Sequence, residues 1–474
     1  MGKQAKGGAW SLMATEVIAQ PGWPAEATGR RGQRERRKEA WLLVLALLVV
    51  LAADREAALG TGAPDYAWLR LLAVSLLVML LVAHLVLRRV APAADPVLLP
   101  IVTVINGVGI VMIHRLDVAG QTRARLLGRV APRADGPLQL VWMGIGVALF
   151  VAVVLMVQEH RSLSRFTYTA GAAGLGLLVL PALLPARFSQ VNGAKLWIRF
   201  AGLSFQPAEL GKVALIISFA GYLAANRQTL ALVTTRVLGF PFPRARDVGP
   251  LLLVWAVTLL VLYAEHDLGT ALLFFGIFLT MLYVATDLVS WLMLGGVLFG
   301  GASVFAATYS PVVHERVFIW LHAFADPSGR GYQLVQGLFG LASGGLFGSG
   351  LGRGSPQLVP FASTDFIVPS IGEELGATGV MGLLVLYALL VSRALSTGLR
   401  VPDGFGKLLA AGVAITLTLE VFLVVGGVTR LIPLTGKTTP WLSYGGSSLL
   451  GNYLILGLLA RLSHSARSRR PPVT

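Results

Sequence analysis

The sequence predicts an all-α polytopic membrane protein. Hydrophobic residues make up 55% of the 474 residues and charged residues only 13%, whereas charged residues form about a quarter of an average soluble domain. The mean hydropathy is +0.73. Apolar runs of roughly 15 to 23 residues recur along the chain, which suits helices crossing a hydrocarbon core of about 30 Å. A β-barrel would show alternating apolar and polar residues instead.

The first 40 residues are polar and then strongly basic, with six basic side chains between Arg30 and Lys38. They lack the apolar core of a cleavable signal peptide. We expect residues 1–40 to be a disordered cytoplasmic tail, and residues 463–474 to form a second cytoplasmic tail.

About twelve transmembrane helices are predicted between the two tails. The first is the weakest, because Asp54, Arg55 and Glu56 interrupt it. The predicted spans are 41–59, 67–87, 97–114, 138–157, 167–184, 207–224, 249–264, 268–285, 290–308, 371–394, 407–428 and 444–462.

An even number of spans places both termini on one side of the membrane. Most basic loops and both tails fall on that side, and the positive-inside rule makes it cytoplasmic. One predicted outer loop, residues 115–133, is arginine-rich and does not obey the positive-inside rule. The two longest loops, 185–206 and 309–370, are both on the outer face, where long loops are usually functional.

The net charge of +16 arises from loops and tails between the spans. This placement favours orientation in the membrane and contact with anionic lipid over nucleic-acid binding, so no nucleic-acid partner is expected. The chain has no cysteine. It therefore has no disulfide, no thiolate metal site and no thiol nucleophile.

Three carboxylates lie where the long outer loop meets a hydrophobic helix, within residues 364–376. Carboxylates are costly in hydrocarbon, so we expect them at the membrane surface or in a wet cavity. From spacing alone, Asp365 is equally well explained as a reactive group or as the helix N-cap. Ser370 and Glu373 have the spacing of a capping box. Glu374 points about 100° away from Glu373 around the helix axis.

The outer stretch 192–206 combines an Asn-Gly turn with basic and aromatic residues. Lys195 and Arg199 have the charge to hold a pyrophosphate. Trp197 between them is typical of an interfacial anchor, which is the favoured interpretation from this segment alone.

Further charged residues fall inside or beside the spans. Glu209 and Lys212 are three residues apart on one helix face and can neutralise each other in the membrane. Asp267 lies in an outer turn, where a structural role is favoured over a cation site. Glu420 is alone within a span and is a functional candidate whose partner the sequence does not name.

Two further segments depart from ordinary spans. Residues 331–352 place apolar side chains densely among glycines, which suits a re-entrant or interfacial helix. Residues 433–448 contain prolines, glycines and hydroxyls that break the start of the last span. Such backbone is tolerated at membrane depth only against protein or a wet cavity, and it commonly lines substrate sites.

Taken together, these segments resemble the SEDS family of bacterial cell-wall proteins, which includes RodA, FtsW and SpoVE. The resemblance covers residues 95–462. It is carried by NGAKLWIRFAGLSFQPAELGK, HDLGTAL, GYQLVQGLFGLASGGLFGSGLG, TDFIVPSIGEELGATG and PLTGKTTPWLSYGGSS, in the family's order and spacing. The family core has ten helices, so residues 41–94 would add two transmembrane helices ahead of it.

The resemblance implies a peptidoglycan glycosyltransferase that polymerises lipid II at the outer face of the bacterial cytoplasmic membrane, together with a class B penicillin-binding protein. The family's essential outer-loop aspartate falls on Asp365. Three departures concern finer contacts: Glu265-His266-Asp267 replaces a usual Gln-Pro-Asp, residues 360–363 lack the usual Pro-Glu-x-His, and Glu420 and Val424 stand where Gln and Asn are common.

This chemistry implies roles for individual residues. Asp365 would act as the general base on the acceptor hydroxyl. Lys195, Arg199 or a divalent cation, Mg²⁺ or Mn²⁺, would hold the departing pyrophosphate, and no organic cofactor is expected. A single displacement inverts the sugar carbon. The expected substrate-binding residues are Lys195, Trp197, Arg199, Gln206, Glu209, Lys212, Asp267, Tyr332, Gln333, Glu374, Lys437, Ser443, Tyr444 and Ser447.

Two other functions are compatible with the sequence. A flippase or transporter of lipid-linked precursor would use Glu209, Lys212 and Glu420 and the broken last helix. A scaffold that only recruits a transpeptidase would need no reactive aspartate. Polymerisation of lipid II in detergent by the wild type, and its loss in Asp365→Ala, separates both from the enzyme.

Overall fold

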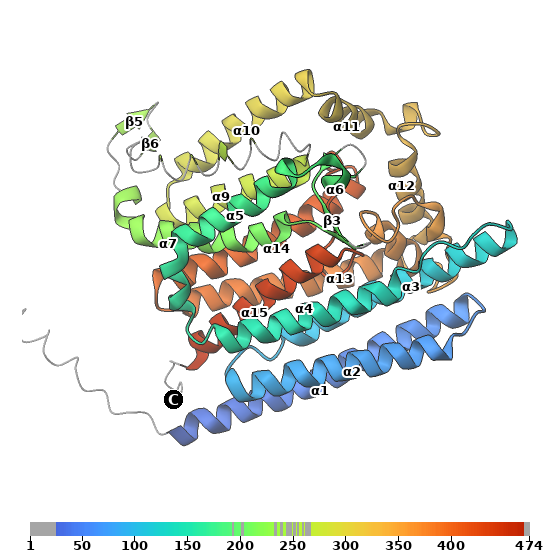
Figure 1. Cartoon of the computed structure of the whole chain (residues 1–474), viewed down its shortest axis with the longest axis horizontal. Helices are drawn as coiled ribbons and strands as arrows, with labels where there is room; N and C mark the ends of the chain where they lie inside the picture. Colours follow the sequence, from blue (N-terminus) through green and yellow to red (C-terminus); the bar gives the residue numbers. More distant parts are fainter. Residues whose placement is uncertain are drawn as a thin grey trace, which may run out of the picture.

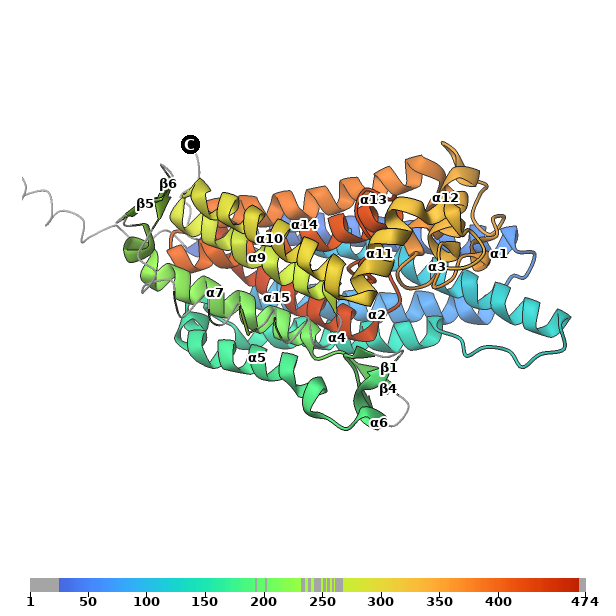
Figure 2. The same cartoon turned by 90° about the horizontal axis from the view of Figure 1, so that it is seen from above.

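A computed structural model of the chain describes residues 25–468, except 192–193, 201–202, 232–234, 238–239, 243–248, 250–252, 254–255, 258–259 and 261–266. Long helices lie side by side in one bundle, and α11 and α12 gather towards one end (Figures 1 and 2). Both belong to the predicted outer loop 309–370, which is called the outer loop below. The long helices are α1 Ala25–Gly60, α2 Tyr66–Val90, α3 Leu98–Leu126, α4 Gly136–Met156, α5 Thr167–Leu183, α7 Ala208–Ala231, α9 Leu268–Thr286, α10 Val289–Tyr309, α13 Ile367–Arg400, α14 Gly404–Val428 and α15 Gly446–Ser468.

Shorter elements connect the long helices. Three two-stranded antiparallel hairpins pair β1 with β2, β3 with β4 and β5 with β6. The short elements are η1 His160–Phe166, α6 Ala186–Ser189, β1 Gln190–Val191, β2 Ala194–Lys195, β3 Ile198–Phe200, β4 Leu203–Phe205, β5 Thr235–Val237, β6 Phe240–Phe242, α11 Pro311–His322, η2 Ala323–Ala325, α12 Tyr332–Gly344 and η3 Pro356–Leu358.

The described part of the chain contains nine helices that are long and apolar enough to cross a membrane, which confirms an all-α polytopic membrane protein. α1 is not among them, and it carries the interrupting charges of residues 54–56. α15 is not among them either. The predicted span 249–264 lies largely outside the described residues. The total of about twelve spans therefore stays a prediction.

The structure departs from the sequence prediction most clearly in three segments. α1 begins at Ala25, so residues 25–40 are helical rather than a disordered tail. α3 continues to Leu126, beyond the predicted end at residue 114. The predicted long loop 309–370 contains two helices, α11 and α12, and two short 3₁₀ turns. α12 supplies the helix that the glycine-rich segment 331–352 predicted.

Charged residues from distant parts of the sequence meet at one end of the bundle. Arg467 near the end of α15 bonds Asp95 before α3 at 2.5 Å, and its guanidinium lies 3.9 Å from Glu35 of α1. Arg393 of α13 lies 3.9 Å from Asp95. These contacts bring together regions that the charge pattern assigned to one membrane face.

α13 is broken at Gly376, which has φ 67° and ψ −172°. The outer-loop segment 345–350 runs into this break. Its amides at residues 349 and 350 donate to Glu373 O and Glu374 O, both at 3.0 Å. Its carbonyls at residues 345 and 346 accept from the amides of residues 377 and 378, at 2.9 and 3.1 Å. The loop therefore supplies the hydrogen bonds that the helix loses at its break.

Candidate functional site

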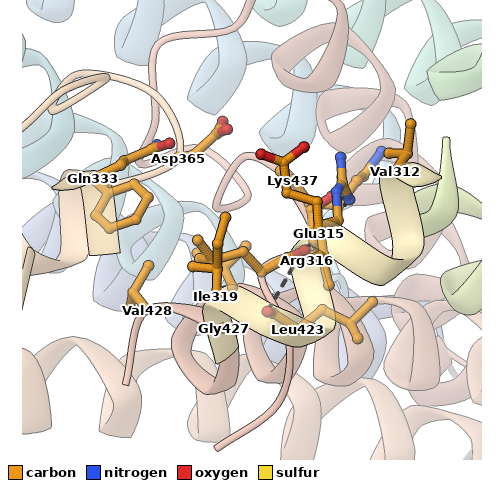
Figure 3. Close-up of a pocket in the computed structure, with 15 residues that line it drawn as sticks. Val312, Glu315, Arg316, Ile319, Gln333, Asp365, Leu423, Gly427, Val428 and Lys437 are labelled. Carbon is orange, nitrogen blue, oxygen red and sulfur yellow. Dashed lines mark hydrogen bonds between the residues drawn. The ribbon is translucent and has the colours of Figure 1, made fainter. Parts of the chain in front are cut away.

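A cavity of about 280 Å³ lies beside the junction of the outer loop and α13 (Figure 3). Its wall comes from four parts of the chain that are far apart in sequence: α11, the start of α12, the turn before α13, and the end of α14 with the loop after it. The lining residues are Val312, Glu315, Arg316, Ile319, Gln333, Asp365, Phe366, Leu423, Val424, Gly427, Val428, Leu434, Thr435, Gly436 and Lys437.

Asp365 is half-buried in the cavity wall, two residues before α13 begins. The N-cap of α13 is Phe366, and no side-chain bond caps the helix. The capping interpretation of Asp365 is therefore wrong. Burial raises the pKa of the Asp365 carboxyl to about 6, although the charges of Lys437 and Arg316 act in the opposite direction. A carboxylate of this kind can accept a proton near neutral pH.

Two cationic residues share the cavity with Asp365. Arg316 of α11 donates to Leu434 O and Thr435 O, both at 3.3 Å. A Cβ at Gly436 would lie 3.7 Å from Asp365 Oδ2 and 3.9 Å from Arg316 Nη2, so the carboxylate and the guanidinium flank the same glycine. Lys437 follows directly. The cavity therefore combines a proton acceptor with positive charge able to hold an anion.

Hydrogen bonds fix the turn that carries Asp365 to the loop before α15. Ser443 Oγ donates to Thr364 O at 2.6 Å, and Tyr444 N donates to Ser363 O at 2.8 Å. Neither Ser443 nor Tyr444 lines the cavity. Both were expected to bind substrate, but the structure gives their bonds to the turn beside Asp365.

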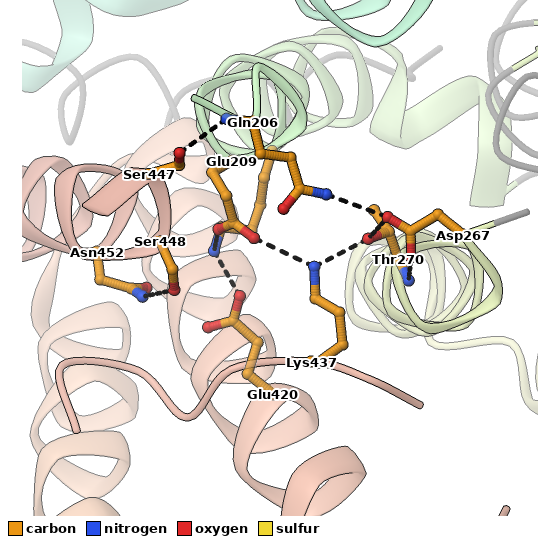
Figure 4. A network of polar contacts seen from close by, with 10 residues as sticks. Gln206, Glu209, Asp267, Thr270, Glu420, Lys437, Ser447, Ser448 and Asn452 are labelled. Carbon is orange, nitrogen blue, oxygen red and sulfur yellow. Dashed lines mark hydrogen bonds and ion pairs between the residues drawn. The ribbon is translucent and has the colours of Figure 1, made fainter. Parts of the chain in front are cut away.

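Behind the cavity, Lys437 joins a buried network of charges (Figure 4). Its Nζ donates to Glu209 Oε1 at 3.1 Å and to Thr270 Oγ1 at 2.9 Å. Lys212 Nζ donates to Glu209 Oε2 at 2.9 Å and also to Glu420 Oε1. The predicted pairing of Glu209 with Lys212 is confirmed, and Glu420 has Lys212 as its partner.

The same network continues through Asp267 and Gln206 (Figure 4). Asp267 caps α9 by accepting from Thr270 N at 2.9 Å, which confirms its structural role. Gln206 Nε2 donates to Asp267 Oδ2 at 3.2 Å, and Gln206 N donates to Ser447 Oγ at 2.7 Å. These contacts tie the start of α7 to α9 and α15. Among the residues of this network, only Lys437 also lines the cavity.

Four further predicted substrate-binding residues, Lys195, Trp197, Arg199 and Tyr332, also lie outside the cavity lining. Lys195 and Trp197 are half-buried in the β2–β3 region, and Arg199 is exposed on β3. Tyr332 is exposed at the start of α12, whereas its neighbour Gln333 lines the cavity. Neither Lys195 nor Arg199 is among the residues that line the cavity with Asp365.

The side chains of Glu373 and Glu374 accept hydrogen bonds from backbone amides of the outer loop. Glu373 Oε1 accepts from Ser355 N at 2.6 Å, and Ser370 Oγ donates to Phe366 O. The capping box is therefore wrong, because α13 already begins at Ile367. Glu374 Oε1 accepts from Arg115 Nε at 2.7 Å, and its Oε2 accepts from Gly352 N at 2.9 Å. Glu374 is thus a buried structural residue and not part of the cavity wall.

Sequence reasoning missed Arg316 and Glu315. Both belong to α11, a 12-residue helix that starts with Pro311. The only signal was a charged pair among the apolar residues of this short outer segment, a pattern typical of an interfacial helix. Nothing in the linear sequence connects that segment to Asp365.

The cavity lining offers carboxylate ligands for a divalent cation. Glu315 and Asp365 are the two carboxylates among the cavity-lining residues. Mg²⁺ commonly binds through one or two carboxylates together with water and substrate phosphates. No group of three or more His, Asp or Glu side chains suited to a metal occurs among the described residues.

The chain matches the family model for FtsW, RodA and SpoVE, described as cell cycle proteins, over residues 96–468. It is 46% identical over 432 residues to the peptidoglycan glycosyltransferase RodA of Mycobacterium tuberculosis, covering 90% of this chain and 89% of the relative. It is 31% identical to a probable peptidoglycan glycosyltransferase FtsW of Trichlorobacter lovleyi, covering 78% of this chain and 93% of the relative.

Solved structures show the same fold. One comes from a study of how a peptidoglycan synthase complex coordinates polymerisation and crosslinking. It has a TM-score of 0.59 and 27% identity, covering 80% of this chain and 99% of the other. The rod-shape-determining protein RodA of Thermus thermophilus has a TM-score of 0.54 and 26% identity, covering 79% of this chain and 97% of the other.

Proposed function

Because the chain belongs to the FtsW, RodA and SpoVE family of peptidoglycan glycosyltransferases, we propose that it polymerises lipid II into glycan strands at the outer face of the bacterial cytoplasmic membrane. The observation that carries this proposal is the cavity in which half-buried Asp365 lies beside Arg316 and Lys437. A base next to two cations suits the transfer of a sugar from a pyrophosphate.

Asp365 is the general base of the proposed reaction. The 4-hydroxyl of an acceptor GlcNAc attacks the anomeric carbon of a MurNAc that is linked to undecaprenyl pyrophosphate. The new C–O bond forms as the bond to the pyrophosphate breaks, and the bonding electrons leave with the pyrophosphate. Asp365 takes the hydroxyl proton. A single displacement of this kind inverts the anomeric carbon.

Arg316 and Lys437 stabilise the departing pyrophosphate, in place of the Lys195 and Arg199 that the sequence suggested. Arginine is well suited because its planar guanidinium donates two parallel bonds to phosphate oxygens. Lys437 is already held by Glu209 and Thr270, so its ammonium is fixed before substrate arrives. A Mg²⁺ or Mn²⁺ ion bound through the phosphates would add to this charge.

The test replaces Asp365 with asparagine, which keeps the shape of the side chain but removes the base. We expect Asp365→Asn to lower polymerisation of purified lipid II in detergent by about 10²- to 10⁴-fold. The control is Asp326→Asn in the same outer loop, where Asp326 is half-buried and its side chain bonds the nearby Gly329 and Arg330. Normal glycan synthesis by Asp365→Asn would refute the site, and no synthesis by wild type with its partner would refute the function.

The flippase alternative would use Glu209, Lys212 and Glu420 as its working charges. These residues bond one another in the buried network, so their charges are compensated within the protein. This arrangement supports a structural role for them and favours the polymerase. The assay separates the two functions directly, because no transport is possible in detergent.

A class B penicillin-binding protein is the proposed partner. Support comes from the similarity to a chain of a peptidoglycan synthase complex. The polymerisation assay is therefore run with and without that partner. The scaffold alternative predicts that cells carrying only Asp365→Ala still grow normally.

A further inference from the structure

We propose that the α1–α2 hairpin is a positioning element of the active site, because its tip holds the outer-loop segment 350–357 against the first turns of α13, the helix that Asp365 precedes. This inference rests on the proposed function of Asp365. The hairpin precedes residue 96, where the family match begins. The alignment with the mycobacterial relative covers 90% of the chain, more than the residues from 96 onwards can supply, so that relative shares part of the preceding region.

The α1–α2 hairpin packs closely against α3. Val50 of α1 packs so closely on Gly107 that a Cβ at this glycine would lie 2.1 Å from Val50 Cγ2. Nearer the tip, buried Asp54 accepts from Trp68 Nε1 at 3.0 Å, and the Trp68 ring stacks on His114 with centroids 4.1 Å apart. Asp54, one of the charged residues that interrupt the first predicted span, therefore makes a buried contact between α1 and α2.

The hairpin tip touches the outer loop backbone to backbone. A Cβ at Gly60, the last residue of α1, would lie 2.1 Å from Leu351 O. A Cβ at Gly352 would lie 2.2 Å from Ala57 O. Only glycines allow two backbones to approach this closely. A side chain at either position would therefore push α1 and the loop apart.

The loop segment that the hairpin touches is in turn bonded to α13 and α3. Gly352 N donates to Glu374 Oε2, and Ser355 N donates to Glu373 Oε1. Arg115 binds Glu374 Oε1 at 2.7 Å, Gly354 O at 2.7 Å and Gln357 Oε1 at 3.3 Å. A continuous set of contacts therefore leads from the hairpin tip to the first turns of α13.

Displacing the loop at Gly352 would disturb the bonds of Glu373 and Glu374 and shift the start of α13, which Asp365 precedes. A misplacement of about 1 Å at a reacting group can lower the rate about 100-fold. The hairpin is therefore expected to affect turnover without contacting substrate.

The test variant is Gly60→Ala. Alanine favours the helical conformation at the end of α1, but its Cβ would force Leu351 O away. The matched control is Gly144→Ala on α4, which also faces the hairpin. Its Cβ would meet only the flexible end of Met79, at 3.2 Å from Cε.

We expect Gly60→Ala to lower kcat for lipid II polymerisation by about tenfold or more, with the KM for lipid II unchanged and Gly144→Ala like wild type. Because the chain has no cysteine, maleimide labelling of Leu351→Cys reports the position of the loop. We expect labelling to be faster when Gly60→Ala is also present.

A kcat equal to that of Gly144→Ala would overturn the proposal, and so would a rise in KM with kcat unchanged. If Gly60→Ala does not accumulate in the membrane, Trp68→Phe decides the question. It removes the donor to Asp54 and shortens the buried ring that stacks on His114, and we expect at least a threefold lower kcat, the effect of losing one hydrogen bond alone being about that size. An unchanged kcat overturns the proposal. Lack of polymerisation by wild type would instead refute the proposed function.

Discussion

At the scale of single residues, the balance of burial and charge around Asp365 sets its behaviour. Burial raises the pKa of its carboxyl to about 6, and Lys437 and Arg316 limit that rise. A general base works only when deprotonated. The acid limb of the rate profile should therefore have its midpoint near pH 6, with activity lost at lower pH.

Replacing Arg316, one of the two cationic residues near Asp365, should shift the acid limb of the rate profile to higher pH. Arg316 lowers the pKa of Asp365, so Arg316→Gln should raise that pKa and move the limb to higher pH. The loss of activity should then be larger at pH 6 than at pH 8. Polymerisation rates across this pH range test it, with Arg330→Gln, an exposed arginine of the same loop, as control. A limb that stays in place would mean that the two charges do not interact.

At the scale of elements, the break in α13 depends on one glycine. Gly376 has φ 67° and ψ −172°, a conformation almost confined to glycine. A Cβ there would lie 2.3 Å from Gly348 N and 2.5 Å from Leu346 O. The break and the loop that fills it therefore form one unit.

Gly376→Ala should destabilise the protein by about 2 kcal/mol or more, from backbone strain and displacement of the loop. The control is Gly382→Ala in the same helix, where a Cβ meets nothing within 4 Å. There alanine should stabilise the helix by up to about 1 kcal/mol. Thermal unfolding in detergent measures both. Equal melting temperatures would contradict the role of the break.

At the scale of the whole molecule, the buried charge network joins elements that are distant in sequence. Lys212 of α7 is 2% exposed and bonds Glu209 and Glu420. Removing this cation leaves two buried carboxylates less compensated. Lys212→Met should therefore destabilise the protein by about 3–5 kcal/mol.

Thermal unfolding again provides the measurement. Lys407→Met, at an exposed position of α14, should change stability by no more than about 0.5 kcal/mol. Adding Glu420→Gln to Lys212→Met should recover part of the loss, because one uncompensated charge is then removed. A Lys212→Met protein as stable as Lys407→Met would show that the network contributes little.

The orientation of the bundle is also testable on the whole molecule. The absence of cysteine allows single cysteines to report sidedness. A membrane-impermeant maleimide should label Asp326→Cys in intact cells but Lys407→Cys only after permeabilisation. The reverse pattern would overturn the proposed outer position of the Asp365 cavity.

Much of the helix arrangement could be predicted from the sequence, because apolar runs of membrane-spanning length have few alternatives to a helix. The pairing of Glu209 with Lys212 was also predictable, since it depends only on helical spacing. Boundaries were less accurate where helices leave the membrane: α3 continues to Leu126 because hydropathy marks only the apolar part of a helix.

The sequence by itself determined the membrane class and most of the helices, because these depend on composition and on apolar runs, and its resemblance to a known family pointed to Asp365. Tertiary structure alone decided which residues surround that aspartate. It brought Arg316 and Lys437 to the cavity, left Lys195 and Arg199 away from it, and assigned Glu374 to Arg115. The physical reason is that such contacts join segments separated by up to hundreds of residues, and only helix packing sets the distances between them.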